Sequence, residues 1–103
     1  MNPRDHAVWR AEKMGKATLY SSAHLMLGLN AFEPGQAHAA HSHGELDKAY
    51  LVLEGAGRFS LDGEDHRLGP GGLLVAPAGV PHGVHNDGDA RLLVLVTMAP
   101  GPR

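Results

Sequence analysis

The pattern of hydrophobic and polar positions along the chain predicts short strands. Leucines alternate with other residues across 23–33, apolar residues run without interruption through 49–53, and further apolar runs occupy 73–76 and 91–98. Glycine, proline and Asn-Asp clusters separate these runs, and such residues interrupt regular structure. About eight strands at roughly 8–12-residue spacing indicate an all-β sandwich or barrel.

One dipeptide predicts how two of these strands are joined. Asp62-Gly63 lies between the strands expected at 58–61 and 64–68, and Asp-Gly favours the tight two-residue turn of a β-hairpin. The chain shows neither a repeat nor a linker, so we expect a single domain over 1–103.

The first residues allow two structures. Apolar residues fall near helical spacing within 4–14, which predicts one short helix. The alternative is an irregular arm that packs Trp9 against the domain. In either case we expect an N-terminal arm over 1–20 and a barrel over about 22–98.

The composition of the chain indicates which partners and which chemistry it lacks. The chain has nine basic and eleven acidic residues, a net charge of −2 with neutral histidines, and no basic run, so we expect no nucleic-acid partner. It has no cysteine, which excludes disulfides and thiolate chemistry. Charged residues interrupt the N-terminal segment and no apolar stretch reaches membrane-spanning length, so we expect a cytoplasmic protein without membrane contact.

Two of the expected strands, 49–53 and 91–96, are apolar on both faces. A strand in an antiparallel barrel normally meets solvent on one face, so a second apolar face indicates that something covers the outside. The simplest cover is a second copy of the chain, and we expect a homodimer.

Three histidines are candidate metal ligands. His41 and His43 have the i, i+2 spacing that puts two side chains on one face of a strand, where two imidazoles can share a metal ion. His82 follows a stiff Pro-x-Gly-x-Pro turn and is the candidate third ligand. A His-x-His pair alone is a weak signal, so the surrounding glycines and prolines matter more.

The spacing of glycines, prolines and histidines in this part of the sequence resembles the two motifs of the cupin superfamily. The first motif reads Gly-x5-His-x-His-x3,4-Glu-x6-Gly, and its matching residues here are Gly35, His41, His43 and Gly55. The second reads Gly-x5-Pro-x-Gly-x2-His-x3-Asn, and it is matched throughout by Gly71, Pro77, Gly79, His82 and Asn86. The resemblance covers roughly 22–98. It implies an all-β double-stranded β-helix, or jelly-roll, cupin barrel with a short N-terminal arm or helix, usually as a dimer.

The resemblance also implies a divalent metal ion (Fe, Mn, Ni or Zn) bound by His41, His43 and His82. The glutamate of the first motif has no counterpart. Counting back from the closing glycine puts Lys48 at its position, whereas the shorter spacing after His43 reaches Asp47. Neighbours on a strand point to opposite sides, and the pattern ties Lys48 to the same face as Tyr50 and Val52.

Three arrangements of the site follow. Water completes a three-histidine shell, or a bulge turns Asp47 or Glu45 inward as a fourth ligand, or no metal binds tightly and Lys48 faces an anionic ligand. A lysine beside a divalent ion is repelled by it. If Lys48 faces inward, it is a candidate catalytic base or anion clamp.

Other residues complete these expectations. His38 is expected to be exposed at the approach to the first motif, His85 to point away from His82, and Asn86 to cap the turn that follows it. The residues expected to line the cavity are Met26, Tyr50, Phe59 and Met98.

Two classes of function remain open at this point. The first is a metal-binding protein that acts on or binds a small oxygenated, anionic metabolite through three histidines, as a metal-dependent dioxygenase or isomerase would. The second is a non-catalytic small-molecule-binding or sensor protein with weak or no metal binding.

Overall fold

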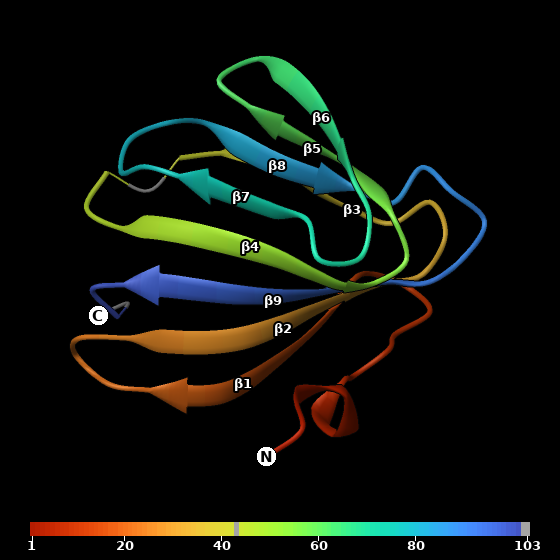
Figure 1. Ribbon diagram of the computed structural model, residues 1–103, viewed down its shortest axis with the longest axis horizontal. Helices are drawn as coiled ribbons and strands as arrows, with labels where there is room; N and C mark the ends of the chain where they lie inside the picture. Colours follow the sequence, from red (N-terminus) through yellow and green to blue (C-terminus); the bar gives the residue numbers. More distant parts are fainter. Residues whose placement is uncertain (43, 102–103) are drawn as a thin grey trace.

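The computed structural model describes residues 1–42 and 44–101 (Figure 1). Within them, a short 3₁₀ helix, η1 (Pro3–His6), precedes nine strands. The strands are β1 (Gly15–Ser21), β2 (Met26–Phe32), β3 (Ala37–His41), β4 (Asp47–Glu54), β5 (Gly57–Leu61), β6 (Glu64–Leu68), β7 (Leu73–Ala76), β8 (His82–His85) and β9 (Leu92–Ala99). Among the described residues no helix is long and apolar enough to cross a bilayer.

The strands form two antiparallel sheets. One sheet has the order β1-β2-β9-β4-β7 and the other the order β3-β8-β5-β6. The chain passes repeatedly from one sheet to the other, and the two sheets face each other (Figure 1). This arrangement is a double-stranded β-helix, so the all-β jelly-roll prediction is confirmed.

The hairpin predicted at Asp62-Gly63 is present. β5 and β6 pair in continuous register, and the two turn residues have φ angles of 52° and 81°. Positive φ at both positions is the property for which Asp-Gly is preferred in such turns.

The core lies between the sheets because their strands alternate inward and outward side chains. On β4, Lys48, Tyr50 and Val52 are buried, while the residues between them are less so. Tyr50 and Phe59 are fully buried and their rings pack 5.8 Å apart. Complete burial of one large apolar side chain contributes about 1.5–3 kcal/mol, so this interior dominates the stability of the barrel.

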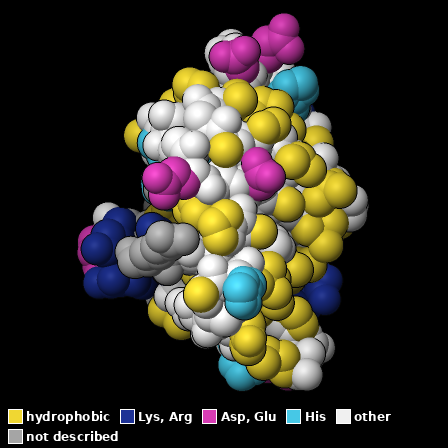
Figure 2. Space-filling view, turned by 90° about the vertical axis from the view of Figure 1, so that its left-hand side faces the viewer, with side chains coloured by type: hydrophobic (Ala, Val, Ile, Leu, Met, Phe, Trp, Pro, Cys, Tyr) yellow, Lys and Arg dark blue, Asp and Glu magenta, His cyan; other side chains and the backbone are white. Residues whose placement is uncertain are grey.

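The outer face of the five-stranded sheet is also apolar, and only part of it is covered. Trp9 packs on a second cluster that contains Leu29, Ala31 and Leu93. On β7, by contrast, the side chains of Leu73 and Val75 are 61% and 51% exposed. Figure 2, which views the molecule from the left of Figure 1, shows hydrophobic side chains gathered toward its right-hand side.

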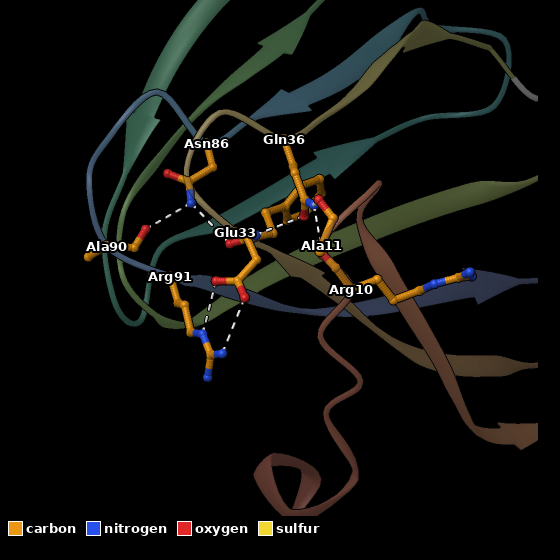
Figure 3. A network of polar contacts seen from close by, with 8 residues as sticks. Arg10, Ala11, Glu33, Gln36, Asn86, Ala90 and Arg91 are labelled. Atoms are coloured by element: carbon orange, nitrogen blue, oxygen red, sulfur yellow. Dashed lines mark hydrogen bonds and ion pairs between the residues drawn. The ribbon is translucent and has the colours of Figure 1, made fainter.

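The segment before β1 is an irregular arm, so the helix predicted over 4–14 is wrong beyond the single turn of η1. The arm is also shorter than the predicted 1–20, because Gly15–Ser21 form β1 and pair with β2. The Gln36 side-chain amide donates hydrogen bonds to the carbonyls of Arg10 (2.8 Å) and Ala11 (3.3 Å), as Figure 3 shows. Those carbonyls therefore accept from a side chain far along the sequence instead of from the backbone N–H groups of a helix. The Arg91 guanidinium lies 4.5 Å from the centroid of the Trp9 ring, which holds the arm from its other side.

Candidate functional site

A β-bulge on β3 places His38 and His41 on the same face of the strand. His38 pairs with Val84 and His41 with His82, so Ala39 and Ala40 together oppose the single residue Gly83. One extra residue reverses the inward–outward alternation of a strand. His38 and His41 therefore lie on the same side of β3 although they are three residues apart.

Gly83 makes room for this bulge. A Cβ at residue 83 would lie 2.9 Å from the Ala40 nitrogen and 3.0 Å from the His38 carbonyl oxygen. Real Cβ atoms do not approach backbone atoms so closely, so a side chain at this position would displace the bulge.

Three histidine rings consequently form a row. The ring centroids of His38 and His41 are 4.4 Å apart, and those of His41 and His82 are 4.5 Å apart. His82 is only 2% exposed, and its centroid lies 5.9 Å from that of Tyr50. Two predicted ligands from different strands, His41 and His82, are thus brought together.

Backbone carbonyls orient both of these imidazoles. His41 Nδ1 lies 2.8 Å from the Ala39 carbonyl oxygen, and His82 Nδ1 lies 2.9 Å from that of Val80. A carbonyl oxygen only accepts, so each Nδ1 carries the proton in these contacts. In the neutral ring Nε2 then has the lone pair, which is the usual arrangement of a metal-binding histidine.

The third predicted ligand, His43, lies outside the described residues. Within 1–42 and 44–101 no three side chains of His, Cys, Asp or Glu form a group that could hold a metal ion. Among the described residues, His41 and His82, with Nδ1 atoms anchored on backbone carbonyls, suit the binding of a divalent ion.

Lys48 shares the buried face of β4 with Tyr50 and Val52, as the strand pattern predicts, and this face points into the barrel. Its side chain is 4% exposed, and its Nζ lies 5.4 Å from the centroid of the Tyr50 ring. Burial, and then the positive charge of Lys16, lower the pKa of Lys48 to about 8. At neutral pH the amine is therefore mainly charged, at the position that the first motif gives to a glutamate.

Asp47 has a different environment from its neighbour. β4 keeps continuous register with β9 from Asp47 to Val52, so the bulge that would turn Asp47 inward is absent there. The Asp47 carboxylate is exposed and accepts a hydrogen bond from the Ala78 backbone N–H at 2.9 Å. Glu45 is exposed in the preceding turn. Asp47 thus anchors the β7–β8 loop instead of turning toward the histidines as a fourth ligand.

A cavity of about 130 Å³ opens between the sheets beside Lys48. Met26 and Met98, both expected to line a cavity, do border it, together with Asn30 and His38. Tyr50 and Phe59, also predicted to line the cavity, instead lie fully buried in the core beside it. The Tyr50 hydroxyl has no hydrogen-bond partner within the described part of the chain.

His38 is a site residue that the sequence pattern did not reveal. It was expected to be exposed, but it is half-buried, and its Nδ1 is buried without a hydrogen-bond partner among the described residues. Burial and the charge of the neighbouring His41 lower the pKa of His38 to about 4. A regular strand would put residues 38 and 41 on opposite faces. Gly83, as a glycine within a strand, was the one hint of a bulge in the sequence.

His85 and Asn86 of the second motif have structural roles, as the sequence predicted. His85 points outward, where its Nδ1 lies 2.8 Å from the Arg58 guanidinium. Asn86 is fully buried, and its amide donates to the carbonyls of Phe32 (3.0 Å) and Ala90 (2.8 Å), as Figure 3 shows. Asn86 also accepts from the Gly88 N–H at 3.2 Å, so it caps the predicted turn.

The two sheets and the histidines between them define the chain as a small jelly-roll barrel with a polar site inside it. Residues 28–98 match the family described as Cupin domain. The chain therefore belongs to the cupin family.

Comparison with individual proteins agrees with this membership. The crystal structure of TT1209 from Thermus thermophilus is 38% identical and has a TM-score of 0.95, with 99% of this chain and 97% of that chain covered. The uncharacterized protein MJ1618 of Methanocaldococcus jannaschii is 30% identical over 66 residues, which are 64% of this chain and 53% of that protein. Dimethylsulfoniopropionate lyase DddW of Ruegeria pomeroyi is 36% identical over 59 residues, which are 57% of this chain and 38% of the lyase. The chain thus spans about half or less of each of these two curated relatives.

Proposed function

We propose that this protein is a metal-binding cupin that binds or acts on a small oxygenated, anionic metabolite. His41, His43 and His82 would hold a divalent ion such as Fe, Mn, Ni or Zn. The observation that carries the proposal is the pairing of His41 with His82, each with Nδ1 anchored on a backbone carbonyl. When bound, the metal supplies a Lewis acid for an oxygen of the ligand, as dioxygenases and isomerases require.

Lys48 supports an anionic ligand. A buried ammonium group is costly unless a negative charge pairs with it. No carboxylate within the described residues forms an ion pair with Lys48. A carboxylate of the ligand would supply the missing partner and orient the ligand in the cavity. One relative is named as a dimethylsulfoniopropionate lyase, which is the name of an enzyme acting on a small propionate.

A non-catalytic binding or sensor protein is the second candidate. Lys48 favours this candidate, because it stands where the first motif has a glutamate ligand. A cation there is repelled by a divalent ion, so the site would hold a metal less tightly. Turnover separates the two candidates. We expect metal-reconstituted protein to convert a member of a panel of dicarbonyls, catechols, hydroxy acids and sugars, and His41→Ala to lose that activity. Tight binding without conversion of any member would support the sensor instead.

We also propose that the protein is a two-fold homodimer. Leu73 and Val75 of β7 pair with Leu51 and Ala49 of β4, so their side chains form one apolar patch on the outer face of the sheet. The N-terminal arm packs on a different part of that face. Exposed apolar patches of this kind commonly mark interfaces. Light scattering is expected to report a dimer and Leu73→Lys a monomer. A wild-type monomer at micromolar concentration would contradict the proposal.

A further inference from the structure

The lysines and arginines of this protein have different surroundings. Each of the five described arginines forms an ion pair with a carboxylate, at distances from 2.7 to 3.9 Å. The three lysines of the chain form none within the described residues, although the net charge is −2. All three, Lys13, Lys16 and Lys48, border two cavities that share lining residues.

The inner cavity is the one of about 130 Å³ between the sheets. Lys48 borders it from β4, and Lys16 borders it from the edge strand β1. Lys16 pairs with Asn30 of β2, a buried polar residue that also lines the cavity. The wall of this cavity therefore has two cations and one amide, with methionine side chains beside them.

The outer cavity, of about 370 Å³, lies under the N-terminal arm. Arg10 and Lys13 border it from the arm, and Lys16 and His38 border both cavities. Arg10 is paired with Glu12 at 3.1 Å, but both side chains are largely exposed, so this pair is weak. His38, whose buried Nδ1 has no hydrogen-bond partner among the described residues, lines both cavities.

We infer that the two cavities form one site for an elongated ligand with an anionic group at each end. One anionic group pairs with Lys48 inside the barrel, and the other pairs with Lys13 and Arg10 under the arm. Lys16 and His38 contact the part of the ligand between them. This inference rests on the proposed function for the anionic character of the inner group, and it adds the second charge and the length.

Electrostatics favours two anionic groups over one. Cations gathered in one groove repel one another over distances up to a Debye length of about 8–10 Å, and they attract anions into the groove. A ligand with a single anionic group would leave the lysines at one end without a partner. Lysine, a flexible point charge, pairs with either a carboxylate or a phosphate.

Isothermal titration calorimetry on the protein as purified tests this inference. The probes are succinate, adipate and 2-phosphoglycolate, compared with butyrate and hexanoate as single-charge ligands of similar length. We expect succinate to bind about tenfold more tightly than butyrate, or adipate about tenfold more tightly than hexanoate, since each pair has the same number of carbon atoms. Binding by 2-phosphoglycolate in preference to the dicarboxylates would assign one end to phosphate.

Variants locate the two ends. Lys13→Gln and Arg10→Gln should weaken the doubly charged probe about three- to tenfold and leave the single-charge probe unchanged. Lys48→Met should weaken both probes. Arg67→Gln, which removes the same charge from β6 on the other sheet, is the matched control and should change neither. Thermal unfolding checks that each variant is folded.

Three results would overturn the inference: equal affinity for singly and doubly charged probes, unchanged affinity in both Lys13→Gln and Arg10→Gln, or no binding of any probe. Metal content, measured on the same samples, separates this outcome from failure of the proposed function. A metal-free protein that still prefers the doubly charged probes would keep the two-ended site and remove the metal centre. A metal-loaded protein that shows no preference for the doubly charged probes would keep the metal centre and remove the two-ended site.

Discussion

Lys48 holds its ammonium group 5.4 Å from the centroid of the Tyr50 ring, inside the barrel and away from carboxylates of the described residues. A cation–π contact contributes about 0.5–2 kcal/mol. Removing an ammonium group from water costs several kcal/mol, so the contact with Tyr50 does not offset the cost of burial. The burial of Lys48 is therefore expected to cost stability, as for a residue whose charge pairs with the proposed anionic ligand.

Lys48→Met should accordingly stabilise the protein and weaken its affinity for anions. Methionine has a similar length and no charge, so we expect the free energy of unfolding to rise by about 1–3 kcal/mol. Urea denaturation measures this change. A less stable variant would show that the lysine contributes to folding rather than to binding.

Stability should also depend on pH in an unusual way. The pKa of Lys48 is about 8 in the folded chain against 10.5 for the unperturbed side chain, so the unfolded state binds more protons between these values. The free energy of unfolding contributed by this group should then rise from pH 8 to pH 10.5. Burial raises the pKa of the Tyr50 hydroxyl, which keeps that group protonated over the same range.

Urea denaturation at several pH values, on wild type and Lys48→Met in parallel, isolates this contribution. Lys16, the other cation near Lys48, is present in both proteins, so only its repulsion with Lys48 differs between them and counts as part of the Lys48 contribution. The difference in stability between the variant and the wild type should shrink as the pH passes 8. A constant difference would mean that the folded Lys48 titrates normally.

The bulge that brings His38 beside His41 should depend on Gly83. In Gly83→Ala the new methyl group would meet the Ala40 backbone at 2.9 Å, so we expect a loss of about 1–3 kcal/mol and a displaced histidine row. The matched control is Gly69→Ala, where a Cβ would meet nothing within 4 Å. Equal stability of the two variants would show that β3 adapts to a side chain at residue 83.

Gln36 should keep the arm in place. Gln36→Ala removes the hydrogen bonds to the Arg10 and Ala11 carbonyls, which is expected to cost about 1–2 kcal/mol. Limited trypsin digestion should then cut faster after Arg10 and Lys13, while cutting after Arg67 stays unchanged. Unchanged cutting at the arm would mean that its other contacts, such as those of Trp9 and Arg4, are enough to hold it.

Local sequence rules predicted what depends on strand alternation and tight turns. The two-residue period of β4 is enough to direct Lys48 inward, and Asp62-Gly63 is enough to fix a hairpin. His38 was misjudged because a bulge breaks that period. The arm was partly misjudged because Gln36, which binds its carbonyls, is 25 and 26 residues away in sequence. Non-local contacts of this kind leave no local pattern.

The metal content of untagged protein, purified without chelator and measured by mass spectrometry, tests the central claim most directly. Wild type and His85→Ala, which alters a histidine on the outer face, should each contain about one divalent ion per chain. His41→Ala and His82→Ala should lose it while remaining folded. Wild type that stays without metal after incubation with Fe, Mn, Ni and Zn, or His41→Ala and His82→Ala that retain it, would contradict a metal centre built on these histidines.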